Sequence, residues 1–231
     1  GETTANFHGA LATETRLDAF SPEAVSAADM ALWQQAAEAQ AERTFALLGQ
    51  RLATLTPDGA RLAETVLASR HGTARQLPAL DHATDFDRIR IHGDYHLGQT
   101  LRVPGGFVII DFEGEPSKPL VARREKHCAL KDVAGMLRSL DYAAATADLA
   151  AGAEATEAAP LTAMRQAFLE GYHAQAARSA RRFLPTTAAA RDAWAGLFEL
   201  EKALYEVEYE LNNRPTWVHI PLAALARLLA S

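Results

Sequence analysis

The chain has 231 residues, which is enough for one sizeable domain or two small ones, and 48% of them are hydrophobic, which supports a well-buried core. Its formal net charge of −6 argues against a nucleic-acid surface, since such a surface needs a basic stripe. No apolar stretch is as long as a membrane span, and the first residues lack the pattern of a secretory signal. We therefore expect a cytoplasmic protein that binds neither nucleic acid nor membrane, and its single cysteine, Cys128, excludes an internal disulfide.

The first ninety residues are expected to be helical. Apolar residues at helical spacing predict a helix over about residues 1–20. Ser21, Pro22 and Glu23 then have the order of a helix start, with serine as N-cap and proline at the first helical position. Further helices are predicted over about 27–50 and 57–70, and a polar run over 81–85 leads into the next elements.

Two apolar segments, 89–91 and 108–110, predict strands, and Pro104, Gly105 and Gly106 between them indicate a hairpin connection. Residues 114–119 have the composition of a loop, and residues 151–160 that of a linker. The remaining helices are expected over about 129–150, 160–178, 186–213 and 221–230. The predicted fold class is therefore mostly α with a short β-hairpin, an α+β arrangement.

Acidic and amide residues follow the two predicted strands at a spacing that indicates phosphoryl transfer. Asp94 comes just after the first strand, Gln99 five residues later, and Asp111 at the end of the second strand. Kinase-type phosphotransferases place one carboxylate at the acceptor hydroxyl and a carboxylate with an amide oxygen on magnesium. We predict Asp94 as the catalytic base and Gln99 and Asp111 as Mg²⁺ ligands, with Glu113 as a second-metal ligand or a loop support.

Other interpretations of the same residues stay open at this point. A Gly-Asp pair is also common in ordinary turns, where the aspartate bonds its own backbone. His92, Asp94 and His96 stand at alternate positions, as ligands of a transition-metal hydrolase would. In kinases, however, a histidine two residues before the catalytic aspartate braces the catalytic loop, which is the role we expect for His92.

Residues 201–211 near the C-terminus form an amphipathic helical pattern. Leu197, Leu200, Leu204, Val207 and Leu211 make its apolar stripe, whereas Lys202, Glu206 and Tyr209 lie together on another side. Hydrogen-bonding groups among aromatic faces suit a carbohydrate, and Trp217 follows shortly after. A surface helix with ion pairs between successive turns is the plainer alternative.

Four stretches together resemble the maltokinases, which belong to the aminoglycoside-phosphotransferase-like branch of the protein-kinase-like fold. They are His92-Gly-Asp-Tyr-His-Leu-Gly-Gln99, Ile109-Ile-Asp-Phe-Glu-Gly-Glu-Pro116, Lys131-Asp-Val-Ala-Gly-Met-Leu-Arg-Ser139 and Asn213-Arg-Pro-Thr-Trp217. The resemblance implies ATP- and Mg²⁺-dependent phosphorylation of maltose to maltose 1-phosphate, for α-glucan synthesis. It also implies that Lys202, Tyr209 and Trp217 contact the sugar, and that trehalose synthase is a fusion or complex partner.

A two-lobed kinase of this kind needs a β-rich ATP lobe with a phosphate-covering loop and a strand lysine, and neither pattern precedes Asp94. We therefore expect residues 1–231 to be a C-terminal lobe that is inactive by itself. Within it we expect leading helices over 1–88, the catalytic loop and metal-binding hairpin over 89–114, and an acceptor-binding helical part over 115–231. Two alternatives remain: a kinase for glucosamine, another hexose or an aminoglycoside, and a non-catalytic docking module of a trehalose or glucan enzyme.

Overall fold

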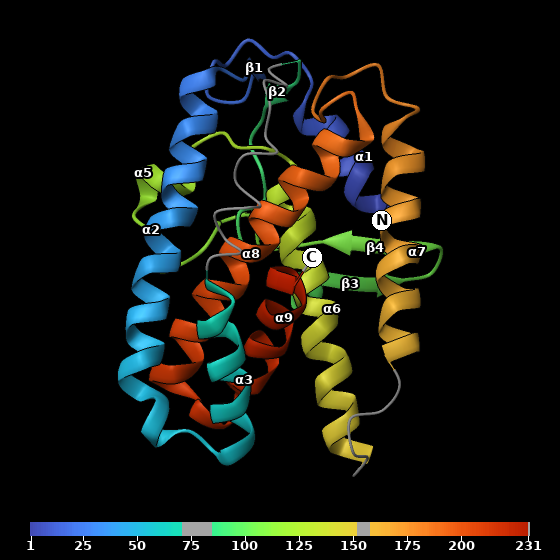
Figure 1. The fold of residues 1–231 in the computed structure, drawn as a ribbon. Coiled ribbons are helices and arrows are strands. Elements are labelled where there is room, and N and C mark those ends of the chain that lie inside the picture. Colours follow the sequence, from blue (N-terminus) through green and yellow to red (C-terminus); the bar gives the residue numbers. More distant parts are fainter. Residues whose placement is uncertain (71–84, 152–157, 231) are drawn as a thin grey trace. The chain divides into compact units, whose positions relative to one another are not determined.

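The computed structural model describes residues 1–70, 85–151 and 158–230, which are mostly helical and contain two small antiparallel sheets (Figure 1). The chain forms two compact units, and each unit is built from two segments of the sequence. The first unit comprises residues 1–26 and 83–191, and the second comprises residues 27–82 and 192–231. Predominant helices with two small sheets agree with the expected fold class, mostly α with a short β-hairpin.

In the first unit, helix α1 (Glu2–Leu11) lies along helix α7 (Ala158–Ala176), far away in sequence (Figure 1). Helix α6 (Leu130–Ala151) contacts α7 as well, and α5 (Leu120–Arg123) is a single short turn. The core of this unit is formed by fully buried apolar side chains, among them Phe86, Ile89, Leu130, Val133, Leu137 and Phe183.

The two sheets of this unit differ from the predicted pairing. Strand β1 (Glu23–Ala24) pairs with β2 (Asp87–Arg88), and β3 (Thr100–Val103) pairs with β4 (Gly106–Ile109). The hairpin turn at 104–106 is confirmed, but its first strand is 100–103 and not 89–91. Ile89 instead forms an isolated bridge with His127, because its amide donates to the His127 carbonyl at 3.0 Å and its carbonyl accepts the His127 amide at 2.8 Å.

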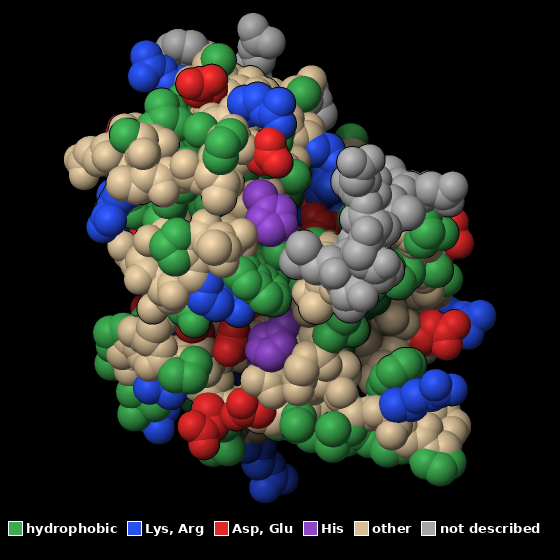
Figure 2. Space-filling model, turned by 90° about the horizontal axis from the view of Figure 1, so that it is seen from below, with side chains coloured by type: hydrophobic (Ala, Val, Ile, Leu, Met, Phe, Trp, Pro, Cys, Tyr) green, Lys and Arg blue, Asp and Glu red, His purple; other side chains and the backbone are tan. Residues whose placement is uncertain are grey.

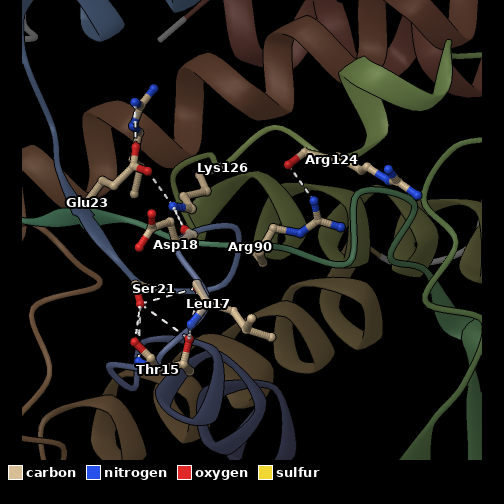
Figure 3. A network of polar contacts seen from close by, with 9 residues as sticks. Thr15, Leu17, Asp18, Ser21, Glu23, Arg90, Arg124 and Lys126 are labelled. Carbon is tan, nitrogen blue, oxygen red and sulfur yellow. Dashed lines mark hydrogen bonds and ion pairs between the residues drawn. The ribbon is translucent and has the colours of Figure 1, made fainter.

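The helix start predicted at Ser21 is wrong, and α1 ends at Leu11 rather than near residue 20. The Ser21 hydroxyl does not cap a helix: it donates to the Thr15 carbonyl at 2.9 Å and so closes the loop after α1 (Figure 3). The Glu23 carboxylate forms ion pairs with Lys126 and with Arg88, the latter at 2.6 Å, which draws residue 23 into strand pairing. Long-range ion pairs thus override a local capping signal.

The second unit is helical, with α2 (Ala27–Arg51), the 3₁₀ turn η1 (Leu52–Thr54), α3 (Pro57–Ala68), the larger part of α8 (Ala188–Asn213), the 3₁₀ turn η4 (Pro215–Trp217) and α9 (His219–Ala230). Helix α3 begins as its sequence suggests, because the Thr56 hydroxyl accepts the Gly59 amide at 3.2 Å and proline occupies the first turn. The apolar stripe predicted on α8 is confirmed. Most of its residues join a core that comprises Ala41, Leu48, Ala63, Val66, Leu200, Ala203, Leu204, Val207, Leu211, Val218, Leu222, Leu225 and Leu229.

The helices predicted over 27–50, 57–70, 129–150, 160–178, 186–213 and 221–230 are confirmed within one to three residues at most ends. The loop over 114–119 is confirmed too, whereas most of the polar run 81–85 and of the linker 151–160 lies outside the described residues. No helix in the described ranges combines the length and hydropathy of a membrane span. On the face drawn in Figure 2, acidic and basic side chains are interspersed among the others.

Candidate active site

The loop that contains Asp94 is held by a buried carboxylate at the start of helix α6. Asp132, only 2% exposed, accepts the backbone amides of His92 at 2.7 Å and Gly93 at 3.0 Å. Gly93 adopts a φ of +81°, a left-handed conformation that glycine reaches without strain. The turn before Asp94 is therefore fixed by two hydrogen bonds to a charged acceptor, the stronger class of hydrogen bond in proteins.

His92 joins this loop to the strand end that precedes Asp111. Its Nε2 donates to the Ile110 carbonyl at 2.8 Å, and its Nδ1 accepts the Asp94 amide at 3.4 Å, so both contacts require the proton on Nε2. The ring is buried and packs against Phe112, with 5.5 Å between ring centroids. The predicted bracing role of His92 is compatible with this geometry.

Gln99 and Asp111 come together as the sequence suggests. The Gln99 side-chain nitrogen donates to Asp111 Oδ2 at 2.9 Å, which brings an amide and a carboxylate side by side. Asp111 has a φ of +63°, the one left-handed non-glycine residue in the described part of the chain. A strained backbone at a strand end often marks a functional position, because surrounding structure must hold it there.

The donor set at this point fits a hard divalent cation. Carboxylate and amide oxygens are the ligands that Mg²⁺ takes in kinase sites, and rotation of the Gln99 amide about its Cγ–Cδ bond would bring its oxygen beside Asp111. Glu113 is exposed two residues further on. Among the described residues, no three His, Cys, Asp or Glu side chains group as a metal site, and this includes His92, Asp94 and His96.

Asp94 itself is half-buried, and its neighbour Tyr95 is buried and fixed on two sides. The Tyr95 hydroxyl lies 2.9 Å from the Thr4 hydroxyl of α1, and burial raises the pKa of this phenol. On the other side, Gly135 of α6 approaches the Tyr95 carbonyl so closely that a β-carbon there would stand 2.6 Å from the oxygen. Helices α1 and α6 thus determine the path of the loop on both sides of Asp94.

The segment after Asp111 is tied back by basic residues. The Arg90 guanidinium donates to the Arg124 carbonyl (Figure 3). It also lies over the Phe20 ring, 5.7 Å from the ring centroid. Lys126 donates to the Asp18 carbonyl at 2.5 Å and pairs with Glu23, whose pKa is lowered first by the Lys126 hydrogen bond and then by Arg88. These bonds connect the loop after α1 with the segments on either side of the candidate site.

The residues predicted to contact a sugar lie in the second unit, on α8 and η4. Arg214 bridges two of them, since its guanidinium stands 5.5 Å from the Tyr209 ring and 4.8 Å from the Trp217 ring. Arg214 also binds Glu210 through two hydrogen bonds, at 3.0 and 2.6 Å. Lys202 Nζ lies 5.0 Å above the Tyr205 ring, and Glu206 is buried on the same helix.

Sequence reasoning missed Asp132, Gly135 and Glu210. Two signals were available for the first pair: an aspartate in the first turn of an otherwise apolar helix, and a glycine inside a helical stripe, which indicates close approach of another backbone. Glu210 and Arg214 are spaced for an ion pair between successive helical turns. Nothing in the sequence shows that this ion pair also orients two aromatic rings.

Comparison with known proteins finds glucosamine kinases that are similar to this chain. No family model matches the chain. A glucosamine kinase of Mycolicibacterium smegmatis is 30% identical over 235 residues, which cover 99% of this chain and 52% of that protein. A glucosamine kinase of Streptacidiphilus jiangxiensis is 29% identical over 238 residues, covering 99% and 48%. The chain thus spans about half the length of the curated relatives it matches.

Solved structures agree with these relatives. A glucosamine kinase crystal structure superposes with a TM-score of 0.71 at 26% identity, over 99% of this chain and 52% of that one. A second, a glucosamine kinase in complex with glucosamine, ADP and inorganic phosphate, has a TM-score of 0.63 at 24% identity and shows the shared fold.

Homologues of this chain are therefore glucosamine kinases, and the broader prediction of a sugar kinase is supported. The narrower resemblance to maltokinases is not supported, nor are maltose as acceptor and trehalose synthase as partner. The residues that suggested maltokinase lie largely around the candidate site, and phosphoryl-transfer groups are shared by kinases with different acceptors.

Proposed function

We propose that this chain provides the acceptor- and metal-binding part of an ATP-dependent kinase that phosphorylates a hydroxyl of glucosamine or a related amino sugar. The observation that carries the proposal is the connection from Asp94 through His92 to the backbone before Asp111, with Gln99 hydrogen-bonded to Asp111 at 2.9 Å. It holds the candidate base and the candidate metal ligands in one fixed framework. The glucosamine kinase relatives support the acceptor class.

In this proposal an Asp94 carboxylate oxygen orients the sugar hydroxyl and accepts its proton as the bond to the γ-phosphorus of ATP forms. The bond from that phosphorus to the bridging oxygen breaks, and ADP leaves. Gln99 and Asp111 would hold Mg²⁺, which when bound neutralises phosphate charge. Glu113 would serve as a further ligand or as a loop support. His92 would hold the loop that contains Asp94 at a fixed position relative to the metal ligands.

Helix α8 offers buried carboxylates as candidate groups for an amino sugar. Glu206 and Glu210 are buried one helical turn apart, and Arg214 provides one positive charge to Glu210. A buried carboxylate such as Glu206 is the kind of group that binds a sugar ammonium by a charge-assisted hydrogen bond. We propose Glu206 as the group that recognises the ammonium, with Lys202 donating to hydroxyls and Tyr209 and Trp217 offering ring faces to the sugar.

We also propose the domain division expected from the sequence, with the catalytic and metal groups within 89–114 and the acceptor groups within 115–231. The sequence ahead of Asp94 has neither a glycine-rich phosphate loop nor a strand lysine. We therefore expect the 231-residue chain alone to transfer no phosphate, and the full-length protein to be the active species. Coupled detection of ADP with glucosamine and Mg²⁺ tests both.

The role of Asp94 is tested by Asp94→Asn, which keeps the shape of the side chain and removes its basicity. Turnover of glucosamine should fall by about 10²–10⁴-fold, while glucosamine affinity measured by calorimetry stays within about twofold. Asp58→Asn is the matched control, because Asp58 is an exposed residue of α3 that forms an ion pair with Arg61 at the surface. Unchanged turnover in Asp94→Asn would exclude it as the base.

The acceptor class is tested with glucosamine, glucose, N-acetylglucosamine and maltose under one set of conditions. Glucosamine should be preferred over glucose by about tenfold or more. The two sugars differ only at C2, where glucosamine has the ammonium group that Glu206 would bind and glucose has a hydroxyl. Glu206→Gln should remove that preference and leave glucose turnover nearly unchanged. A higher rate with maltose than with glucosamine would restore the acceptor that the sequence suggested.

A further inference from the structure

Asp132 is itself held by two residues that lie far from the active-site loop in sequence. His8 Nε2 of α1 lies 3.2 Å from Asp132 Oδ2, and His8 Nδ1 lies 2.8 Å from the Tyr172 hydroxyl of α7. His8 and Tyr172 are 0% exposed and Asp132 is 2% exposed. All three side chains belong to the first unit, where α1 lies beside α7 (Figure 1).

The direction of these hydrogen bonds follows from chemistry. A carboxylate only accepts, so Nε2 of His8 must carry the proton that it shares with Asp132. Burial keeps the pKa of Tyr172 well above its usual value, so the phenol retains its proton, and it donates to Nδ1 of His8 when the ring carries its proton on Nε2 alone. Tyr172 therefore donates to His8, His8 donates to Asp132, and Asp132 accepts the amides of His92 and Gly93.

This order of Tyr, His and Asp resembles that of a nucleophilic triad, but complete burial leaves no path for a substrate. A packing role alone would not require polar side chains, since an apolar trio would fill the same volume without the cost of burying three polar groups. Hydrogen bonds are directional, so Tyr172 and His8 fix the rotamer of the Asp132 carboxylate. That carboxylate in turn fixes the two backbone amides that precede Asp94.

We propose that His8 and Tyr172 are positioning residues for phosphoryl transfer, acting through Asp132 on the loop that contains Asp94. The proposal rests on the proposed function, because the loop matters for catalysis only if Asp94 acts in it. Helix α1 then does more than pack, because Thr4, Phe7 and His8 lie on one of its faces. Thr4 contacts Tyr95, Phe7 contacts the His92 ring, and His8 contacts Asp132.

The test uses three variants of the full-length protein. His8→Phe retains an aromatic ring and removes the donor, His8→Gln replaces the donor with an amide, and Tyr172→Phe removes one hydroxyl. The control is Gln175→Ala, which breaks an exposed hydrogen bond of 2.8 Å to Asn6 between the same two helices. Folding of each variant is checked by circular dichroism and thermal melting before any rate is compared.

We expect His8→Phe to lower kcat for glucosamine about tenfold or more with KM changed less than about twofold, since a misplaced base affects the transition state more than sugar binding. His8→Gln should recover part of that loss, Tyr172→Phe should lie between wild type and His8→Phe, and Gln175→Ala should behave as wild type. An unchanged kcat in folded His8→Phe, or an equal loss in Gln175→Ala, would overturn the proposal.

Amide hydrogen exchange separates this proposal from the proposed function. Exchange at His92 and Gly93 should accelerate about tenfold in His8→Phe, because their acceptor loses its fixed rotamer, whereas amides in α9 should not change. If the wild type transfers no phosphate to any sugar, the proposed function fails, and the exchange result still decides whether His8 holds the loop. Unchanged exchange at both amides would refute the mechanical link itself.

Discussion

Replacement of Gly135 by alanine tests how closely helix α6 approaches the loop that contains Asp94. Gly135 lies inside α6, so alanine should favour the helix by about 1 kcal/mol if nothing else changed. However, its β-carbon would stand 2.6 Å from the Tyr95 carbonyl oxygen, and ordinary contacts between such atoms begin near 3.4 Å. Either the helix or the loop must therefore move by more than half an ångström.

Overpacking of this kind costs about 1–3 kcal/mol in well-packed interiors. The steric cost outweighs the gain in helix propensity, so Gly135→Ala should destabilise the protein by about 0–2 kcal/mol. Because the carbonyl that must move belongs to the residue after Asp94, kcat should fall as well. Urea unfolding monitored by circular dichroism gives the first quantity, and the coupled ADP assay gives the second.

Two other helical glycines provide matched controls, because a β-carbon at Gly49 of α2 or Gly196 of α8 would meet nothing within 4 Å. Alanine at either position should stabilise the protein by up to about 1 kcal/mol and leave kcat unchanged. The reasoning would be refuted if Gly135→Ala stabilised the protein as much as the controls do. It would also be refuted if the variant were destabilised with normal kcat, since the strain would then be absorbed away from the loop.

Three further predictions concern single residues. Asp111→Gly should abolish phosphoryl transfer at any Mg²⁺ concentration. It should also stabilise the fold by up to about 1 kcal/mol, because glycine adopts the left-handed φ of +63° freely. A loss of stability in urea unfolding would contradict this. His127 keeps some exposed surface, but desolvation and then Lys131 hold its pKa well below the usual range, so below about pH 6.5 the unfolded chain binds a proton that the folded chain does not. The free energy of unfolding should therefore decrease as the pH is lowered below about 6.5, by at most about 1.4 kcal/mol per pH unit. His127→Asn should reduce this dependence on pH. Burial raises the pKa of Cys128 to about 12, so a disulfide reagent at pH 8 should modify this thiol only after unfolding, and rapid reaction of the folded chain would show that its environment is open.

Local patterns in the sequence determined most of the helices and indicated which residues could form the candidate site. Helical periodicity located α2, α3, α6, α7, α8 and α9 within a few residues at most ends, because an apolar stripe must be buried wherever the helix packs. The pairing of Gln99 with Asp111 was predictable for a similar reason, since a short hairpin brings its two flanks together whatever the rest of the fold does.

Contacts between distant segments decided what the sequence could not. The local pattern at Ser21, Pro22 and Glu23 favours a helix start. In the structure, however, Glu23 lies in a strand, where it binds Lys126 and Arg88, about 100 and 65 residues away. The acceptor is a proposal for a comparable reason, because phosphoryl-transfer residues are shared among kinases that act on different acceptors. Likewise His8, Tyr172 and Asp132 stand in three separate helices and carry no motif of their own. Only tertiary packing brings them into one buried chain of hydrogen bonds, since a hydrogen bond depends on where two atoms meet in space and not on their separation along the sequence.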